Sequence, residues 1–228
     1  MATPNLNLPL IAEGQAQPHV THNEAVDMID ALWGRTVVSA TLAVAPTTPN
    51  DGAAYIVPPS GSGFDPATPG QIALWHGGIW HKIEPRAGWR MFVSDEGRSH
   101  IFDGSTWAPG DVVGALGSSV GLATLEADLT LTGATVTATD LIPDRAIVLG
   151  VTSWVIEAVT GATSYRVGTA SSDNQFGGSL GVAAGSSNIG VVGPFATYSP
   201  EDVIVTAEGG NFTGGRIGLA AAVILPGV

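Results

Sequence analysis

The sequence predicts a mainly β protein: an N-terminal helix and a small Trp-rich β-meander, followed by a C-terminal antiparallel β-sandwich that is jelly-roll-like. Short apolar runs alternate with turns along most of the chain, and only one segment has convincing helical periodicity. The 228 residues also include 31 Gly and 15 Pro. Short strands with no helices between them are typical of sandwiches and jelly rolls.

The predicted helix covers residues 21–33. Thr21 is followed three residues later by Glu24, which is the pattern of a capping box, and apolar residues then recur at helical spacing. Gly34 is expected to end the helix. Residues 5–18, before it, are expected to be extended or loop.

The meander is predicted from repeated aromatic hairpins. Residues 43–70 are rich in Pro, Gly, Thr and Ser around one short strand at 53–57. Residues 75–80 and 102–107 then share the pattern of an aromatic residue, a tight turn and Trp. Between them, residues 89–94 and 98–102 flank Asp95-Glu96-Gly97. Turns with Gly supply the positive φ that hairpins need, so each segment is expected to form a hairpin.

A fall in aromatic density and a Gly/Ser-rich stretch near Gly117 predict two domains, residues 1–117 and 118–228. The second domain shows short β-type runs separated by turns, several of them alternating apolar and polar residues. The strands expected there are 125–131, 146–159, 164–168, 187–192, 203–207 and 216–225.

The composition excludes several classes of partner. A net charge of −12 would repel a phosphate backbone, so nucleic acid is not expected to bind. The longest apolar runs are too short to span a bilayer, and the first ten residues lack the pattern of a secretory signal. We therefore expect synthesis in the cytoplasm without a signal peptide. Only 12% of residues are charged, which suggests that much of the surface is covered by further copies of the chain.

No catalytic or metal site is predicted. His19 and His22 lack the further ligands that a zinc site needs, and the absence of Cys rules out thiolate chemistry. A glycosidase would need two facing carboxylates, and Glu84, Asp95, Glu96 and Asp103 are the candidates on the meander. Asp95 and Asp103 are better explained as turn residues. We expect a protein that is not an enzyme and has no cofactor.

Carbohydrate binding is a separate hypothesis, because the exposed indole rings of Trp residues stack on sugar rings and polar loops form hydrogen bonds with sugar hydroxyl groups. The alternative for the indoles is that they form the core of a small sheet, and this alternative is favoured. The candidate residues are Trp75, Trp80, Trp89, Trp107, Asp173, Asn174 and Gln175.

The first half of the chain resembles a known domain of unknown function. Residues 5–25, NLNLPLIAEGQAQPHVTHNEA, look like the opening of a domain found in alphaproteobacterial prophages and gene transfer agents. The same family continues with Asp-Ala-Leu, here at 30–32, with a Gly-x-x-Tyr-Ile-Val strand, here at 52–57, and with the stretch 88–107. The second half is similar to C-terminal β domains of phage fibre and spike proteins at 160–165 and 211–215.

This resemblance implies a virion protein on the particle surface, most plausibly the base of a head spike. Such a base would contact a capsid vertex protein and a spike fibre protein, and would help the particle attach to the capsular polysaccharide of its host. A homo-oligomer is expected, a pentamer for a vertex base or a trimer for a fibre knob. The alternatives are a tail-fibre or baseplate receptor-binding protein, or a lectin-like module. The family motif carries no catalytic residues.

Overall fold

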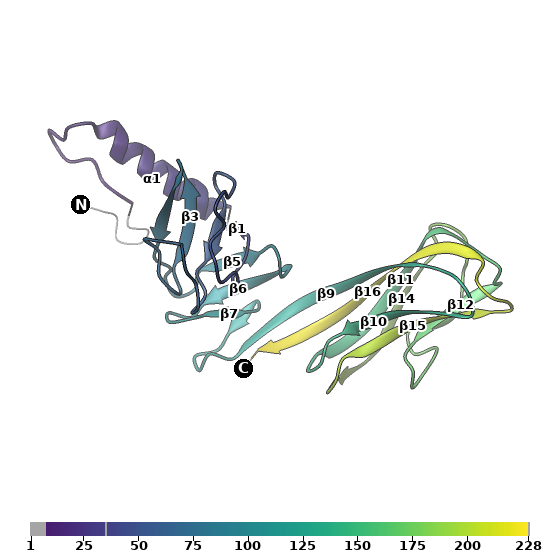
Figure 1. The fold of residues 1–228 in the computed structure, drawn as a ribbon. Helices are drawn as coiled ribbons and strands as arrows, with labels where there is room; N and C mark the ends of the chain where they lie inside the picture. The colour runs from purple at the N-terminus through teal and green to yellow at the C-terminus, as the bar shows by residue number, and fades with distance from the viewer. Residues whose placement is uncertain (1–7, 35, 228) are drawn as a thin grey trace. The chain divides into compact units, whose positions relative to one another are not determined.

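A computed structural model describes residues 8–34 and 36–227 (Figure 1). The described residues form two compact units, one ending at Ser118 and the other beginning at Ser119. The fold is mainly β, with one N-terminal helix, as the sequence predicts. Within the described part of the chain, no helix is long and apolar enough to cross a membrane.

The helix, α1 (Pro18–Trp33), begins three residues earlier than predicted, and the expected capping box does not form. Gln17 precedes the helix in a left-handed conformation, with no side-chain cap. Pro18 occupies the first turn, where its fixed φ and missing N–H suit a helix start. Thr21 therefore lies inside the helix, where its hydroxyl accepts a hydrogen bond from the side chain of Gln15. Residues 5–7 of the predicted extended stretch lie outside the described residues.

The first unit contains two small sheets and a final short strand, β8 (Val112–Val113). One sheet has the order β1-β5-β6-β7, with β1 parallel to β5, and the other has the order β2-β3-β4. Their bounds are β1 (Thr36–Val37), β2 (Ala54–Ile56), β3 (Ile72–His76), β4 (Ile79–Ile83), β5 (Arg90–Val93), β6 (Arg98–Phe102) and β7 (Trp107–Pro109).

The predicted hairpins are present in this unit. Strands β3 and β4 pair in antiparallel register across Gly77 and Gly78, whose φ angles are 59° and 83°. Two successive positive φ angles match the twist of the flanking strands, and glycine adopts them without steric cost. Strands β5 and β6 pair across residues 94–97, and β6 pairs with β7. The meander therefore follows from local turn chemistry.

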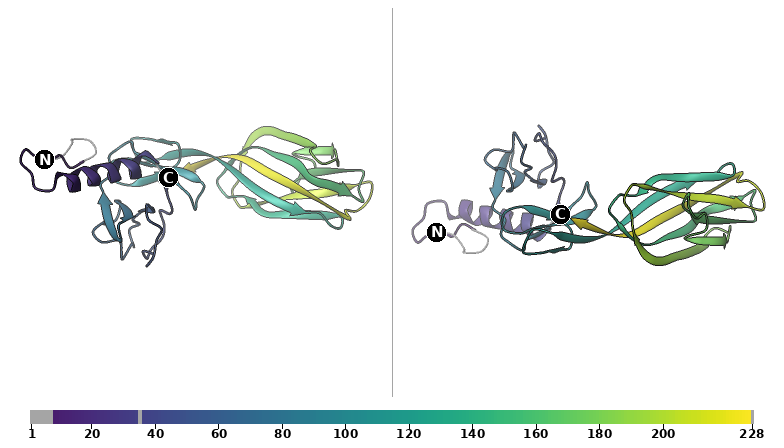
Figure 2. Two further views of the ribbon diagram at one scale, coloured as in Figure 1. Left: turned by 90° about the horizontal axis from the view of Figure 1, so that it is seen from above. Right: turned by 90° about the horizontal axis from the view of Figure 1, so that it is seen from below.

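The second unit is a jelly roll. Its strands are β9 (Ser119–Thr130), β10 (Thr135–Ile142), β11 (Ile147–Thr160), β12 (Ser164–Gly168), β13 (Gly177–Leu180), β14 (Ser187–Ala196), β15 (Glu201–Glu208) and β16 (Gly214–Gly227). The first strand pairs with the last, β10 with β15, β11 with β14 and β12 with β13. Strands β9 and β16 run side by side along their whole length (Figure 2). This nested pairing is a long hairpin rolled into two sheets, which confirms the predicted architecture.

The core of the second unit lies between its two sheets, whose strand orders are β10-β15-β12-β13 and β14-β11-β16-β9. Val205 and Tyr165 from the first sheet and Val151, Ile217 and Leu219 from the second are all at most 1% exposed and belong to one cluster. Each buried strand alternates inward apolar residues with outward ones, as the sequence pattern predicts. Strands β10 and β13 were not among the predicted strands.

Candidate functional site

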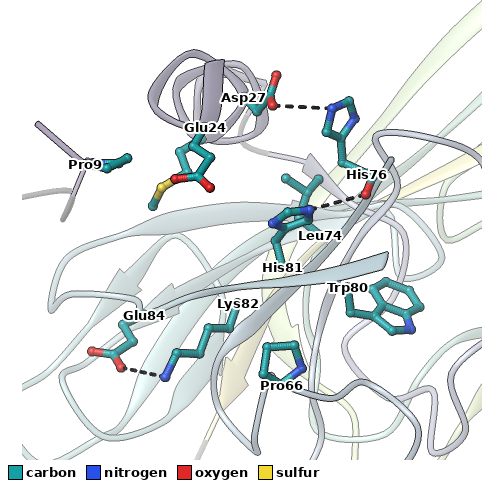
Figure 3. Close-up of a pocket in the computed structure, with 11 residues that line it drawn as sticks. Pro9, Glu24, Asp27, Pro66, Leu74, His76, Trp80, His81, Lys82 and Glu84 are labelled. Atoms are coloured by element: carbon teal, nitrogen blue, oxygen red, sulfur yellow. Dashed lines mark hydrogen bonds and ion pairs between the residues drawn. The ribbon is translucent and has the colours of Figure 1, made fainter. Parts of the chain in front are cut away.

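A cavity of about 470 Å³ lies in the first unit between α1 and the β3–β4 hairpin (Figure 3). This volume is within the range of small-molecule sites, about 300–1,000 Å³. Carboxylate, imidazole and ammonium groups alternate with apolar side chains around it. The lining residues are Pro9, Glu24, Asp27, Met28, Pro66, Leu74, His76, Trp80, His81, Lys82 and Glu84.

The hairpin register decides which side chains reach the helix. Leu74 and His76 alternate along β3 and therefore share one face, and His81 is directly opposite Leu74 on β4. Trp75 and Trp80 are paired on the other face, with ring centroids 4.9 Å apart in an edge-on arrangement. The imidazoles thus lie on the face of the hairpin toward α1 and the two indoles on its other face, although Trp80 still contributes to the lining of the cavity.

His76 connects three segments of the unit. Its Nε2 lies 3.4 Å from Oδ2 of Asp27 on α1, and its Nδ1 lies 3.2 Å from Oδ2 of Asp51 in the turn before β2. Asp51 also accepts a hydrogen bond of 3.0 Å from the backbone N–H of Gly77. Figure 3 shows Asp27 and His76 pointing toward each other. The helix is therefore held beside the hairpin by a carboxylate–imidazole–carboxylate arrangement.

The remaining polar groups make few mutual contacts. His81 Nε2 lies 3.3 Å from the backbone oxygen of His76, and Lys82 Nζ lies 3.7 Å from Oε1 of Glu84. Glu24 is exposed on α1 and lines the same cavity. Hydrogen-bond acceptors and donors beside apolar walls suit a neutral ligand rich in hydroxyl groups. No Ser, Thr or Cys is among the described lining residues.

Of the predicted carbohydrate-binding indoles, only Trp80 lines the cavity. Its ring also packs against Phe64 and Tyr55, at centroid distances of 5.3 and 5.8 Å. Trp75 contacts Trp80, and both are half-buried. Trp89 and Trp107 pack against the buried apolar cluster that includes Ile72, Met91 and Val93. The indole N–H of Trp107 donates a hydrogen bond of 2.9 Å to the backbone oxygen of Gly70. The four indoles thus all contribute to packing, and sugar binding by them stays a prediction.

The other predicted binding residues belong to the second unit. Asp173 and Asn174 are exposed, and Asp173 pairs with Arg166 at 3.1 Å. Gln175 is half-buried, and its Oε1 accepts a hydrogen bond of 3.0 Å from the hydroxyl of Thr169. The loop is therefore ordered by its own contacts. Its proposed role in glycan binding also stays a prediction.

Two of the carboxylates considered for hydrolysis, Asp103 and Glu96, are held by local contacts. Asp103 caps its own turn, and hydrogen bonds from the backbone N–H groups of Thr106 and Ser105 lower its pKa to about 2. Burial raises the pKa of Glu96, but hydrogen bonds from His100 and Arg98 outweigh it and leave the pKa lowered. Of the four candidate carboxylates, only Glu84 lines the cavity.

His19 and His22 are exposed on α1. Across residues 8–34 and 36–227, no group of three or more His, Cys, Asp or Glu side chains is arranged to hold a metal ion.

Sequence reasoning missed the cavity and its arrangement around His76. Glu24 was predicted to belong to a capping box, and neither Asp27 nor His76 was predicted to be a site residue. The spacing of three residues between Glu24 and Asp27 on a helix does place the two carboxylates on one face. That spacing was the available signal, but the packing of the helix against β3 could not be read from it.

Comparison with known proteins gives a match to the first unit. A domain family described as a protein of unknown function, DUF2793, matches residues 22–108, from α1 into β7. No curated protein matches the chain. A chain in the structure "Cyanophage Pam1 capsid asymmetric unit" is similar at 24% sequence identity and a TM-score of 0.34, over 52% of this chain and 91% of that one.

Proposed function

We propose that the chain is a structural, non-enzymatic component of a phage-like particle, displayed on the particle surface. In its finer form, the proposal makes it the base of a head spike in a gene transfer agent or related phage. There it would be mounted on a capsid vertex, contact a spike fibre protein and aid attachment to the host capsule.

The jelly roll is the observation that carries this proposal. Its strands pair first with last and inward from there, which is the topology of many viral capsid and lectin domains. Fold does not by itself give function, so the chemistry of the surface must agree. The described cavity has no Ser, Thr or Cys in its lining, and its carboxylates, Glu24, Asp27 and Glu84, are given no catalytic role in this proposal.

The first unit supports the same proposal independently of the jelly roll. The match at residues 22–108 lies entirely within this unit, and the opening and central motifs of the sequence resemble a domain of phage-like particles. A spike base needs one module that docks on the particle and one that faces outward, and two units can take these two roles. Tail fibre or baseplate protein is the alternative, because a receptor-binding tip would use the same two parts.

The experiment is a particle-association assay. A host strain lacking the gene is complemented with the chain carrying a C-terminal tag, and released particles are separated on a density gradient. We expect the tag to sediment with DNA-filled particles and to remain after a high-salt wash. A tag found only in the soluble fractions would contradict the proposal.

Glycan binding at the cavity is a second candidate function. Carboxylates from Glu24 and Asp27, the imidazole of His81 and the apolar side chain of Leu74 surround a space of about 470 Å³. Sugars offer hydroxyl groups to such donors and acceptors and C–H faces to apolar walls. A single glycosyl unit of a capsular polysaccharide fits this chemistry.

Its test uses two variants and capsulated host cells. We expect E24Q and H81Q to weaken binding of the labelled chain to capsulated cells, with H22Q on the exposed side of the helix as the matched control. Capsule chains should keep their length after incubation, because no catalytic step is proposed. Equal binding by all variants would remove the cavity as the glycan site, and shortened chains would contradict the non-enzymatic role.

A further inference from the structure

One outer face of the jelly roll is apolar. On β14, Ile189 and Val191 are 76% and 75% exposed, and on β9 Leu122 is 67% exposed. The strand register aligns these residues with outward positions of β11 and β16 in the same sheet. The outward residues that make up this apolar face are Val120, Leu122, Ile147, Gly150, Thr152, Ile189, Val191, Ala220, Ala222 and Ile224.

The opposite outer face has a different character. On the sheet β10-β15-β12-β13, the outward positions include Thr135, Thr137 and Thr206 and the charged residues Arg166 and Glu208. Glu208 accepts hydrogen bonds from Ser164 and from the backbone of Ser179. An antiparallel sheet that faces water normally shows such polar residues. The apolar face departs from that pattern and is therefore expected to be covered.

The apolar face has a self-complementary shape. Ile189 and Val191 form a ridge along the edge strand β14. Beside it, Gly150 on β11 and Ala220 and Ala222 on β16 leave a trough of small side chains. Val191 is directly opposite Gly150 in the register, so ridge and trough are immediate neighbours. The ridge of one copy fits the trough of another.

Charge limits where a second copy can approach. The chain carries a net charge of −12, so two copies repel each other over most of their surface. The outward rows that contain Val191 and Leu122 carry no charged residue, whereas the row of Ile189, Thr152 and Ala220 ends at the exposed Glu126 on β9. The apolar face is thus where two copies can approach closely with the least repulsion.

The flat footprint of the face is about three quarters of the area that a stable interface takes from each partner, before the protruding side chains are counted. The shortest strand of the sheet, β14, has 10 residues. Four strands about 4.8 Å apart, with about 3.3 Å per residue, give a flat footprint on the order of 600 Å². Protruding side chains enlarge the accessible area of such a face. A stable interface takes roughly 800 Å² from each partner.

We propose that the apolar face of the sheet β14-β11-β16-β9 is a self-association surface whose occupant is a second copy of this chain, with the Ile189/Val191 ridge in the partner's Gly150/Ala220/Ala222 trough. The inference extends the proposed function, because it names the surface through which a spike would assemble. It concerns the free chain, so it holds or fails independently of the particle.

The first experiment measures the mass of the full-length chain by light scattering after size exclusion. We expect the wild-type chain to give a multiple of 23.1 kDa at micromolar concentration, and V191D to give the single-chain mass. The matched control, T137D, places the same charge on the opposite outer face and should leave the multiple unchanged. A monomeric wild type, or equal masses for the two variants, would overturn the proposal.

A charge-pair experiment tests the ridge-in-trough contact itself and does not depend on V191D alone. A222K places a cation in the trough and should also give single chains. Mixing V191D with A222K sets the new carboxylate of one copy against the new ammonium group of the other in one contact. In the second contact, the unchanged Val191 of the A222K chain meets the unchanged Ala222 of the V191D chain. The multimeric mass should therefore return. A mixture of V191D with T137K should stay monomeric. No recovery in the first mixture, or equal recovery in both, would contradict the assignment.

The two proposals fail differently. A chain that is monomeric yet sediments with particles would refute the self-association surface and leave the structural role standing. A chain that multimerises through the apolar face but never joins a particle would refute the structural role alone.

Discussion

The indole of Trp154 lies directly over Gly218. The two residues are opposite each other on β11 and β16, and a Cβ atom on Gly218 would lie 2.1 Å from Cζ2 of Trp154. Only glycine allows the ring to lie against the neighbouring strand at this point. The close approach accounts for a glycine in the middle of a strand, where glycine is otherwise unfavourable.

Replacing Gly218 therefore tests the packing of the jelly roll. We expect G218A to lower the free energy of unfolding by about 1–3 kcal/mol, because the ring must move to admit the methyl group. Urea denaturation measures it. The control is G193A on β14, where a Cβ would meet no atom within 4 Å. G193A should be neutral or slightly stabilising, and equal losses in the two variants would show that the indole contact is not the cause.

A matched pair of isoleucines tests the core of the first unit. Ile72 is fully buried on β3, and Ile79 on the paired strand β4 is 60% exposed. We expect I72A to destabilise this unit by about 2–5 kcal/mol through the lost burial and the cavity left behind. I79A should change stability by less than about 0.5 kcal/mol. Thermal unfolding followed by tryptophan fluorescence reports the difference, and a reversed order would contradict the buried position of Ile72 and the exposed position of Ile79.

The pairing of Glu96 predicts a pH dependence. Hydrogen bonds from His100 and Arg98 hold the pKa of this carboxyl below its ordinary value of 4.5 in the folded chain. The ionised form therefore stabilises the fold above pH 4.5, and this contribution is lost as the pH falls through the lowered folded pKa.

We accordingly expect E96Q to cost about 1.5–3 kcal/mol at pH 7, the range for a hydrogen-bonded charge. The gap between wild type and E96Q should narrow below pH 4.5, as measured by urea denaturation across pH. E84Q is the control, because Glu84 is 56% exposed and its ion pair is with the exposed Lys82. A gap that stays constant down to the acid range would rule out the ionised pair as its source.

The contact between His76 and Asp27 predicts a local effect on α1. Exposed ion pairs contribute roughly 0–1 kcal/mol, so H76A should speed amide hydrogen exchange in Pro18–Trp33 by up to about fivefold. The control is H81A, which removes an imidazole from the same hairpin without touching Asp27. Equal exchange in the two variants would show that His76 does not hold the helix.

Much of the fold could be predicted because its signals are local. The turn glycines Gly77 and Gly78 specify a hairpin, and the strand Ser164–Gly168 stands at its predicted bounds. The predicted helix start was wrong because a capping box at Thr21 competed with Pro18, and the proline determines the first turn. Strand β10 was missed because its threonines and Asp140 look like loop composition. That strand exists because it pairs with β15, a contact far away in sequence.

The candidate site was less predictable because, like β10, it depends on contacts between residues that are far apart in the sequence. Its residues come from α1, from β3 and from β4, and only tertiary packing brings them together. Aromatic density correctly pointed to the meander. It could not show that Trp80 packs on Phe64 and Tyr55 while His76 and His81 face the helix, because this depends on the pairing register of one hairpin.

The most direct test of the central claim is to locate the chain on intact particles. Particles from the complemented strain would be gold-labelled on the C-terminal tag and imaged by electron microscopy. We predict label at the vertices of the head. Label at the tail tip would instead make the chain a tail-fibre or baseplate protein, and unlabelled particles would contradict a structural role in the virion.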